Sequence, residues 1–227
     1  MTQSPRVHLI FIVLCATTVR VVYFFQFQDN PFFAYVPKAW DQEIYYEGAL
    51  SFARGDFLAV APILDNHFSP AYQYFLGILF WIFGSELQIV WVAQMLLGVL
   101  STLLVYSISC HFFSKTAGLL SALLFTFYAP NWLYEGSLYR APLIVFLELA
   151  AFQLLLALGN RPTRFLLILS ALVLGLFMQI RSNNLLIFPV AFCYLWFRFK
   201  NLDKTKWPLL ISYVLLVVMV CTPALFW

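Results

Sequence analysis

The distribution of charge between long apolar runs constrains this chain more than any other feature. Hydrophobic residues make up 63% of the 227 positions and charged residues only 10%. Such a composition predicts an integral membrane protein. The acids are concentrated between residues 27 and 86, a segment whose basic residues are Lys38 and Arg54; its acids are Asp29, Asp41, Glu43, Glu47, Asp56, Asp65 and Glu86. We expect this acidic segment to carry the function.

The apolar runs and the basic residues together predict the topology. There are eight runs, at about 7–26, 70–84, 88–110, 116–133, 141–158, 164–180, 184–198 and 208–227. A helix over 70–84 would be only about 22 Å long, shorter than the hydrocarbon core of about 30 Å. If this run does not span, most of the basic loop residues gather on one side, as the positive-inside rule requires; they are Arg6, Lys115, Arg161, Arg164, Arg198, Lys200, Lys204 and Lys206.

We therefore predict an all-α, polytopic helix bundle with seven transmembrane helices, forming a single module over residues 1–227. The N-terminus is expected in the cytoplasm and the C-terminus outside. Residues 27–86 form a long first extracytoplasmic loop with juxtamembrane helices at about 42–54 and 70–84. The first run is expected to be a retained signal anchor, because it is too long for a signal-peptide core.

Two classes of function are disfavoured by the residues. The pI near 8.7 reflects the loop Lys and Arg of a membrane protein, so we expect no nucleic-acid partner. A lipid or solute carrier is disfavoured because the runs lack paired Gly/Pro breaks and midplane ionisable clusters. The four cysteines all fall in apolar runs without metal-ligand spacing, which predicts buried free thiols.

Asp41 begins the first predicted loop helix. Its carboxylate could cap the helix by accepting a backbone N–H, or it could act as a general base; spacing alone leaves both readings open, with the cap favoured. Gly55 is expected to end this helix. Farther along the loop, His67 lies in a turn, where a solvated residue is the ordinary reading.

Two other polar positions are predicted at the same outer face as the loop that carries Asp41. Glu135 and Arg140 occupy one short loop, and Arg181 and Asn183 follow the run 164–180. An Arg fork binds phosphate and a carboxylate accepts a proton, so this grouping would suit an anionic lipid substrate. Glu135 could equally be an ordinary loop acid, and Arg181 an interfacial Arg that extends toward water.

One charge lies well inside an apolar run. Burial of Arg20 in a membrane costs about 2.5–3.5 kcal/mol on insertion scales, so a partner is expected. Glu148 is the only other charge that lies away from the ends of the apolar runs, and it is the partner that the sequence offers for a structural ion pair.

Several stretches resemble a known family. They are Asp41-Gln-Glu-Ile-Tyr45-Tyr-Glu-Gly-Ala49, Arg54-Gly55-Asp56-Phe57, Ser69-Pro70-Ala71-Tyr72-Gln-Tyr74, Tyr134-Glu135-Gly136-Ser-Leu138, Gly175-Leu176 and Arg181-Ser182-Asn183. Their order and spacing resemble the GT-C membrane glycosyltransferases, in the branch of the protein mannosyltransferases and the lipid A aminoarabinose transferases. The chain departs from many relatives at Gln42, where they carry a second acid, and at Pro70-Ala71-Tyr72-Gln73.

The resemblance implies an enzyme that uses a polyprenyl-phosphate-linked sugar as donor. It implies Asp41 as the catalytic base and substrate contacts at Glu135 and Arg181. Further candidates for substrate binding are Glu43, His67, Tyr72, Arg140 and Asn183. No metal ligand is expected; a divalent metal is compatible with the family but not required by the sequence. Relatives are longer, so the chain is expected to be a C-terminally shortened N-terminal catalytic module.

The predicted function is transfer of a sugar from the lipid-linked donor to an acceptor, which is a protein, lipid or glycan, at the extracytoplasmic face. In a bacterium the membrane would be the plasma (inner) membrane, and membrane lipids would be further partners. The alternative is a non-catalytic membrane scaffold or remnant module, or a lipid or solute carrier.

Overall fold

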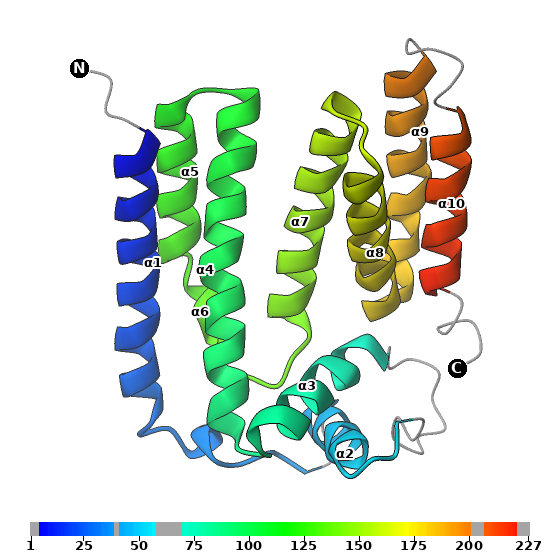
Figure 1. The fold of residues 1–227 in the computed structure, drawn as a ribbon. Helices are drawn as coiled ribbons and strands as arrows, with labels where there is room; N and C mark the ends of the chain where they lie inside the picture. The colour runs from blue at the N-terminus through cyan, green and yellow to red at the C-terminus, as the bar shows by residue number, and fades with distance from the viewer. Residues whose placement is uncertain (1–4, 39–40, 58–69, 201–206, 222–227) are drawn as a thin grey trace. The chain divides into compact units, whose positions relative to one another are not determined.

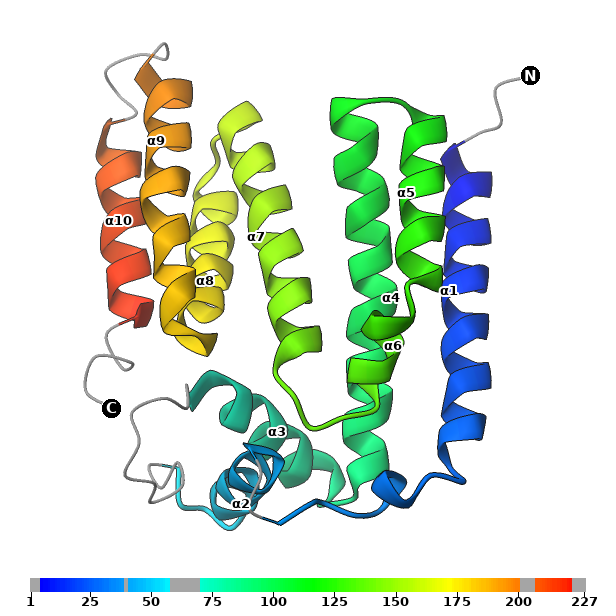
Figure 2. The ribbon, with the colours of Figure 1, turned by 180° about the vertical axis from the view of Figure 1, so that it is seen from behind.

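The computed structural model describes residues 5–38, 41–57, 70–200 and 207–221, and every regular element among them is a helix. Figures 1 and 2 show these elements from opposite sides. The chain divides into two compact units. The first unit comprises residues 1–63 and 72–146, and the second comprises residues 64–71 and 147–227.

The first unit is built on three helices, α1 (Pro5–Phe27), α4 (Leu87–Phe112) and α5 (Lys115–Phe127). Helices α1 and α4 run antiparallel: His8 lies beside Tyr106, whereas Phe27 packs against Trp91. Residues 27 and 87 therefore lie at the same end of the bundle (Figure 1). The chain between them leaves this end and returns to it.

A break divides the apolar run at 116–133, which we had predicted as one helix. Helix α5 ends at Phe127 and α6 (Ala129–Glu135) begins after Tyr128, whose backbone is extended. Pro130 explains the break, because it has no N–H to donate and its ring excludes the preceding turn. Asn131 Nδ2 donates to the carbonyl of Phe125 at 3.1 Å and so satisfies an acceptor left free at the end of α5.

Helices α2 (Asp41–Ala53) and α3 (Pro70–Phe83) occupy the positions predicted for the two loop helices. Gly55 ends α2 as predicted, with a φ of 95°. Its N–H donates to Phe52 O at 2.9 Å and the N–H of Asp56 donates to Ser51 O at 3.1 Å. These two bonds are the pair of a Schellman motif, whose left-handed residue is best supplied by glycine.

The two loop helices approach each other through glycines. A Cβ added at Gly48 of α2 would lie 2.6 Å from Gln73 Oε1 of α3. A Cβ added at Gly77 of α3 would lie 2.7 Å from the side chain of Phe52 of α2. Each helix thus places a glycine against a large side chain of the other, and a methyl group added at either position would force the facing side chain to shift.

The second unit contains the last four helices and most of α7 (Ala141–Asn160). They are α8 (Arg164–Ile180), η2 (Ser182–Leu186), α9 (Ile187–Lys200) and α10 (Trp207–Cys221). Thr163 caps α8 by accepting from the N–H of Leu166 at 3.2 Å. Gly175 lets α8 pack closely against Val220 of α10.

Among the described helices, three are long and apolar enough to cross a membrane: α1, α4 and α7. The apolar helices α3, α5, α8 and α10 are shorter. Large apolar side chains lie open on the helix surfaces, for example Ile10 at 62% and Met219 at 72% exposure. Wide apolar surface of this kind marks contact with lipid, and the chain is an integral membrane protein. The prediction of seven spans stays a prediction.

Candidate functional site

A buried ion pair lies inside the first unit. Arg20 of α1 donates from Nε to Glu135 Oε2 at 2.7 Å and from Nη2 to Glu135 Oε1 at 2.6 Å. Its Nη1 donates to the carbonyl of Ala16 at 3.2 Å. Both side chains are almost fully buried, at 2% and 3% exposure. This is the fork geometry that makes Arg–carboxylate pairs strong.

The partner of Arg20 is therefore Glu135, and the expected pair with Glu148 is wrong. Glu148 is exposed on α7, whereas the break after α5 lets α6 end beside α1 with Glu135 as its last residue. A sequence reading that takes 116–133 as one straight helix places Glu135 in an outer loop and misses this contact.

Gly98 makes room for the ion pair against α4. A Cβ at this position would overlap both the Glu135 carboxylate and the Arg20 guanidinium. The charged groups consequently pack directly on the α4 backbone. Burial raises the pKa of the Glu135 carboxyl to about 7, and the hydrogen bonds and charge of Arg20 oppose that shift. Arg20 is thus what favours the ionised carboxylate in this apolar setting.

Gln94 continues the network from the ion pair to the loop helices. Its Nε2 donates to the backbone carbonyls of Glu135 and Ser137, each at 2.9 Å. Its Oε1 accepts from the hydroxyl of Tyr72 at 2.8 Å. Gln94 and Tyr72 are both fully buried, at 0% exposure. The network therefore joins α1, α3, α4 and α6, and all of its side-chain partners are satisfied by protein groups.

The role of Gln94 escaped the sequence reading, although a signal was present. Gln94 is a polar residue within an apolar run, and Gly98 follows four positions later on the same helix face. A polar residue inside such a run needs a hydrogen-bonding partner. The spacing of Gln94 and Gly98 could therefore have marked the side of α4 on which that partner lies.

Asp41 lies in the first turn of α2 and its side chain is exposed. Tyr45 follows one turn later on the same face of α2 and is buried, with its ring edge-on to that of Tyr72 at 4.9 Å between centroids. Glu43 is half-buried. The exposed carboxylate of Asp41 is thus carried by a helix that the buried network supports.

The remaining predicted residues are distributed along the chain. Arg140 is half-buried in the first unit, just before α7. Arg181 and Asn183 are exposed in the second unit, where Arg181 links α8 to η2 with an extended backbone. His67 lies outside the described residues. The structure brings Glu135 and Tyr72 into one network; the grouping of Asp41, Glu135 and Arg181 around one cavity stays a prediction.

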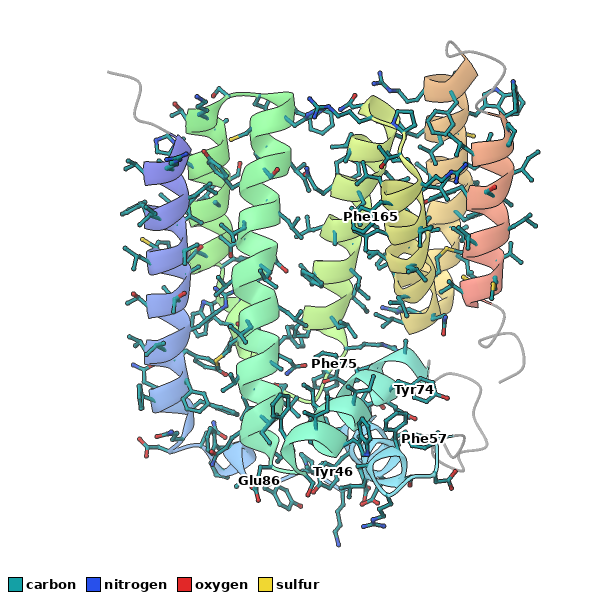
Figure 3. All side chains as sticks on the ribbon, viewed as in Figure 1. Tyr46, Phe57, Tyr74, Phe75, Glu86 and Phe165 are labelled. Carbon is teal, nitrogen blue, oxygen red and sulfur yellow. The ribbon has the colours of Figure 1, made fainter. Side chains whose placement is uncertain are left out.

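A cavity of about 340 Å³ opens at the end of the first unit, near the start of α4. Its lining consists of residues 33–36, Tyr46 and residues 85–88; Tyr46 and Glu86 are labelled in Figure 3. The lining includes the Glu86 carboxylate and no Lys or Arg, so it does not favour a phosphate. Among the described residues no group of three or more His, Cys, Asp or Glu could hold a metal ion.

Comparison with known protein families decides the class. The model of the dolichyl-phosphate-mannose-protein mannosyltransferase family matches residues 67–227, more than half of the chain. The chain belongs to this family. It is therefore a membrane glycosyltransferase of the GT-C type. The matched range includes Tyr72, Glu135 and Arg181, whereas Asp41 precedes it. No curated protein and no solved structure gave a significant match.

Proposed function

We propose that this glycosyltransferase moves a sugar from a polyprenyl-phosphate-linked donor to an acceptor at the extracytoplasmic face of the membrane. Family membership supports the reaction class. The observation that carries the site is the exposed Asp41 carboxylate on α2, a helix whose buried face packs on α3 beside the Arg20–Glu135–Gln94–Tyr72 network. An accessible acid on a supported helix is what a general base requires.

The proposed reaction is a direct displacement at the anomeric carbon. Asp41 accepts the proton of the acceptor hydroxyl or amine while the acceptor atom bonds to the anomeric carbon. The bond from that carbon to the phosphate oxygen breaks, and its electron pair stays on the phosphate. The polyprenyl phosphate leaves with this added negative charge, which a guanidinium stabilises well.

We assign the leaving phosphate to Arg181, assisted by Asn183 and His67. Arg181 is an exposed cation at the end of an apolar helix, where a lipid-borne phosphate would arrive. Glu43 and Arg140 are proposed to contact the acceptor or the sugar. Glu135 and Tyr72 are buried and hydrogen-bonded to protein groups. Their proposed role is therefore to hold the helices of the site in place and not to contact the substrate.

The fold of the first unit supports the proposed orientation. Because α1 and α4 are antiparallel, the chain between them begins and ends at one end of the bundle. This supports the assignment of α2 and α3 to one side of the membrane. The basic loop residues favour the other side as cytoplasmic.

The test is to replace Asp41 by Asn and to measure sugar transfer in vitro from radiolabelled polyprenyl-phosphate sugars. Loss of a general base lowers the rate by about 10²-fold or more. Because Asn caps a helix about as well as Asp, the variant should remain folded. If Asp41 is only a helix cap, Asp41→Asn is nearly silent and Asp41→Ala costs about 0.5–2 kcal/mol of stability.

Glu47→Gln is the matched control. Glu47 is an exposed acid of the same helix, six residues beyond Asp41, and the same change of charge there should leave transfer unchanged. Full activity in Asp41→Asn would remove Asp41 from the chemistry.

A further inference from the structure

The buried network ends at Tyr72, whose side chain joins two parts of the first unit. Its hydroxyl donates to Gln94 Oε1 at 2.8 Å, which fixes α3 to α4. Its ring meets that of Tyr45 at an interplanar angle of 89°, which fixes α3 to α2. Edge-to-face aromatic pairs of this kind add about 0.5–1.5 kcal/mol beyond their buried area.

The position of α2 on α3 depends strongly on this contact. Tyr45, Gly48 and Phe52 lie along the face of α2 that meets α3, and Gly48 leaves no space between the backbone and Gln73. Because that fit is close, a shift of Tyr72 has to be followed by α2 as a whole. Asp41 lies one turn before Tyr45 and would move with it.

We propose that Tyr72 is a positioning residue for Asp41: through its hydrogen bond to Gln94 and its ring contact with Tyr45, it holds α2 in the orientation that aims the Asp41 carboxylate at the acceptor. This proposal rests on the proposed function. Gln94 is held in turn by its hydrogen bond to the backbone carbonyl of Glu135, and Glu135 is held by its ion pair with Arg20.

The first experiment needs no catalysis. In Tyr72→Phe, the ring remains but Gln94 Oε1 loses its hydrogen-bond donor. A buried acceptor without a hydrogen-bond partner destabilises the folded state. Hydrogen exchange of the full-length protein in lipid nanodiscs should show amides of residues 45–53 exchanging about tenfold faster, because local opening of α2 becomes easier. Amides of α5 should keep their rates.

Tyr74→Phe is the matched control. Tyr74 lies on the same helix and packs on Phe52 of α2, but its hydroxyl meets the Phe57 carbonyl at 3.4 Å and has no part in the network. Removal of this hydroxyl should leave the exchange of α2 unchanged. If Tyr72→Phe and Tyr74→Phe give the same exchange pattern as the wild type, the proposed coupling is overturned.

The second experiment tests the role in transfer. Tyr72→Phe should lower kcat about tenfold with KM for the donor unchanged, because misplacement of a catalytic group acts on the chemical step. In the Asp41→Asn background, Tyr72→Phe should have no further effect, since there is no base left to position. If the losses of kcat in the two single variants multiply in the double variant, the positioning role is contradicted. Absence of transfer by the wild-type protein would instead count against the proposed function, and the exchange result would still decide the coupling.

Discussion

Removal of one partner of the buried ion pair should have consequences that depend on which partner is removed. In Glu135→Leu, the Arg20 guanidinium stays charged, because an arginine side chain is not deprotonated in proteins. In Arg20→Met, the Glu135 carboxyl can escape its buried charge by binding a proton. Loss of one partner of a buried pair typically costs about 3–5 kcal/mol, whereas apolar replacement of both is often nearly neutral.

The pH dependence follows from the pKa of Glu135. Burial raises this pKa to about 7 in the wild type, against the opposing effect of Arg20. A carboxyl with a raised pKa contributes stability below its unfolded pKa, and that stability is lost as the pH rises through the folded pKa. Without Arg20 the folded pKa lies above the wild-type value. The wild type should therefore change little above pH 7, while Arg20→Met continues to lose about 1.4 kcal/mol per pH unit.

Between about pH 7 and about pH 8.5, Arg20→Met should lose about 2 kcal/mol relative to the wild type. The deficit of Glu135→Leu should stay constant over the same interval. Unfolding of each variant in mixed detergent micelles, followed by tryptophan fluorescence during a titration with dodecyl sulfate, measures these differences. The double variant Arg20→Met with Glu135→Leu should be more stable than either single variant.

Two results would refute this reasoning. Additive losses in the double variant would show that the two groups act independently. A deficit of Arg20→Met that is constant with pH would show that Glu135 keeps its charge in the absence of Arg20.

Two further outcomes are expected. Gly98→Ala should destabilise the protein by about 1–3 kcal/mol, because the added methyl group overlaps the ion pair. In the Arg20→Met, Glu135→Leu background most of this loss of stability should disappear. If the loss persists there, its cause is the α4 backbone and not the ion pair. For topology, Glu86 and Phe113 flank a 26-residue helix, so they should lie on opposite sides of the membrane. In a variant without native cysteines, Glu86→Cys should react with an impermeant maleimide in intact cells, and Phe113→Cys only after permeabilisation. Labelling of Phe113→Cys alone in intact cells would reverse the proposed orientation.

The helical elements were largely predictable from the sequence because their signals are local. Most of the apolar runs correspond to one α-helix each, and Gly55 ends α2 where the sequence indicated. The break after α5 also had a local signal, Pro130, but the high hydropathy of the surrounding run concealed it. Where a strong apolar pattern and a single proline conflict, the missing N–H decided the local structure.

The buried network was not predictable in the same way, because it depends on contacts between distant residues. Arg20 visibly needed a partner, yet the choice between Glu135 and Glu148 depends on where α6 ends in space. Both acids are compatible with the apolar pattern. Only the direction of the chain after Tyr128 selects Glu135, which is 115 positions from Arg20.

In the proposed site, Asp41 and the buried network meet two different demands on the charged groups of a membrane glycosyltransferase. A base must be reachable by the acceptor, so its carboxylate has to be exposed, and an exposed group on a short helix is poorly fixed by itself. The buried charges of Arg20 and Glu135 are costly to desolvate, but once paired they are held in one geometry. Through their hydrogen bonds, Gln94 and Tyr72 connect this fixed ion pair to α3. Sequence patterns around Asp41 alone are therefore an incomplete guide to the site: the side chains that hold its helix in place come from α1, α3, α4 and α6.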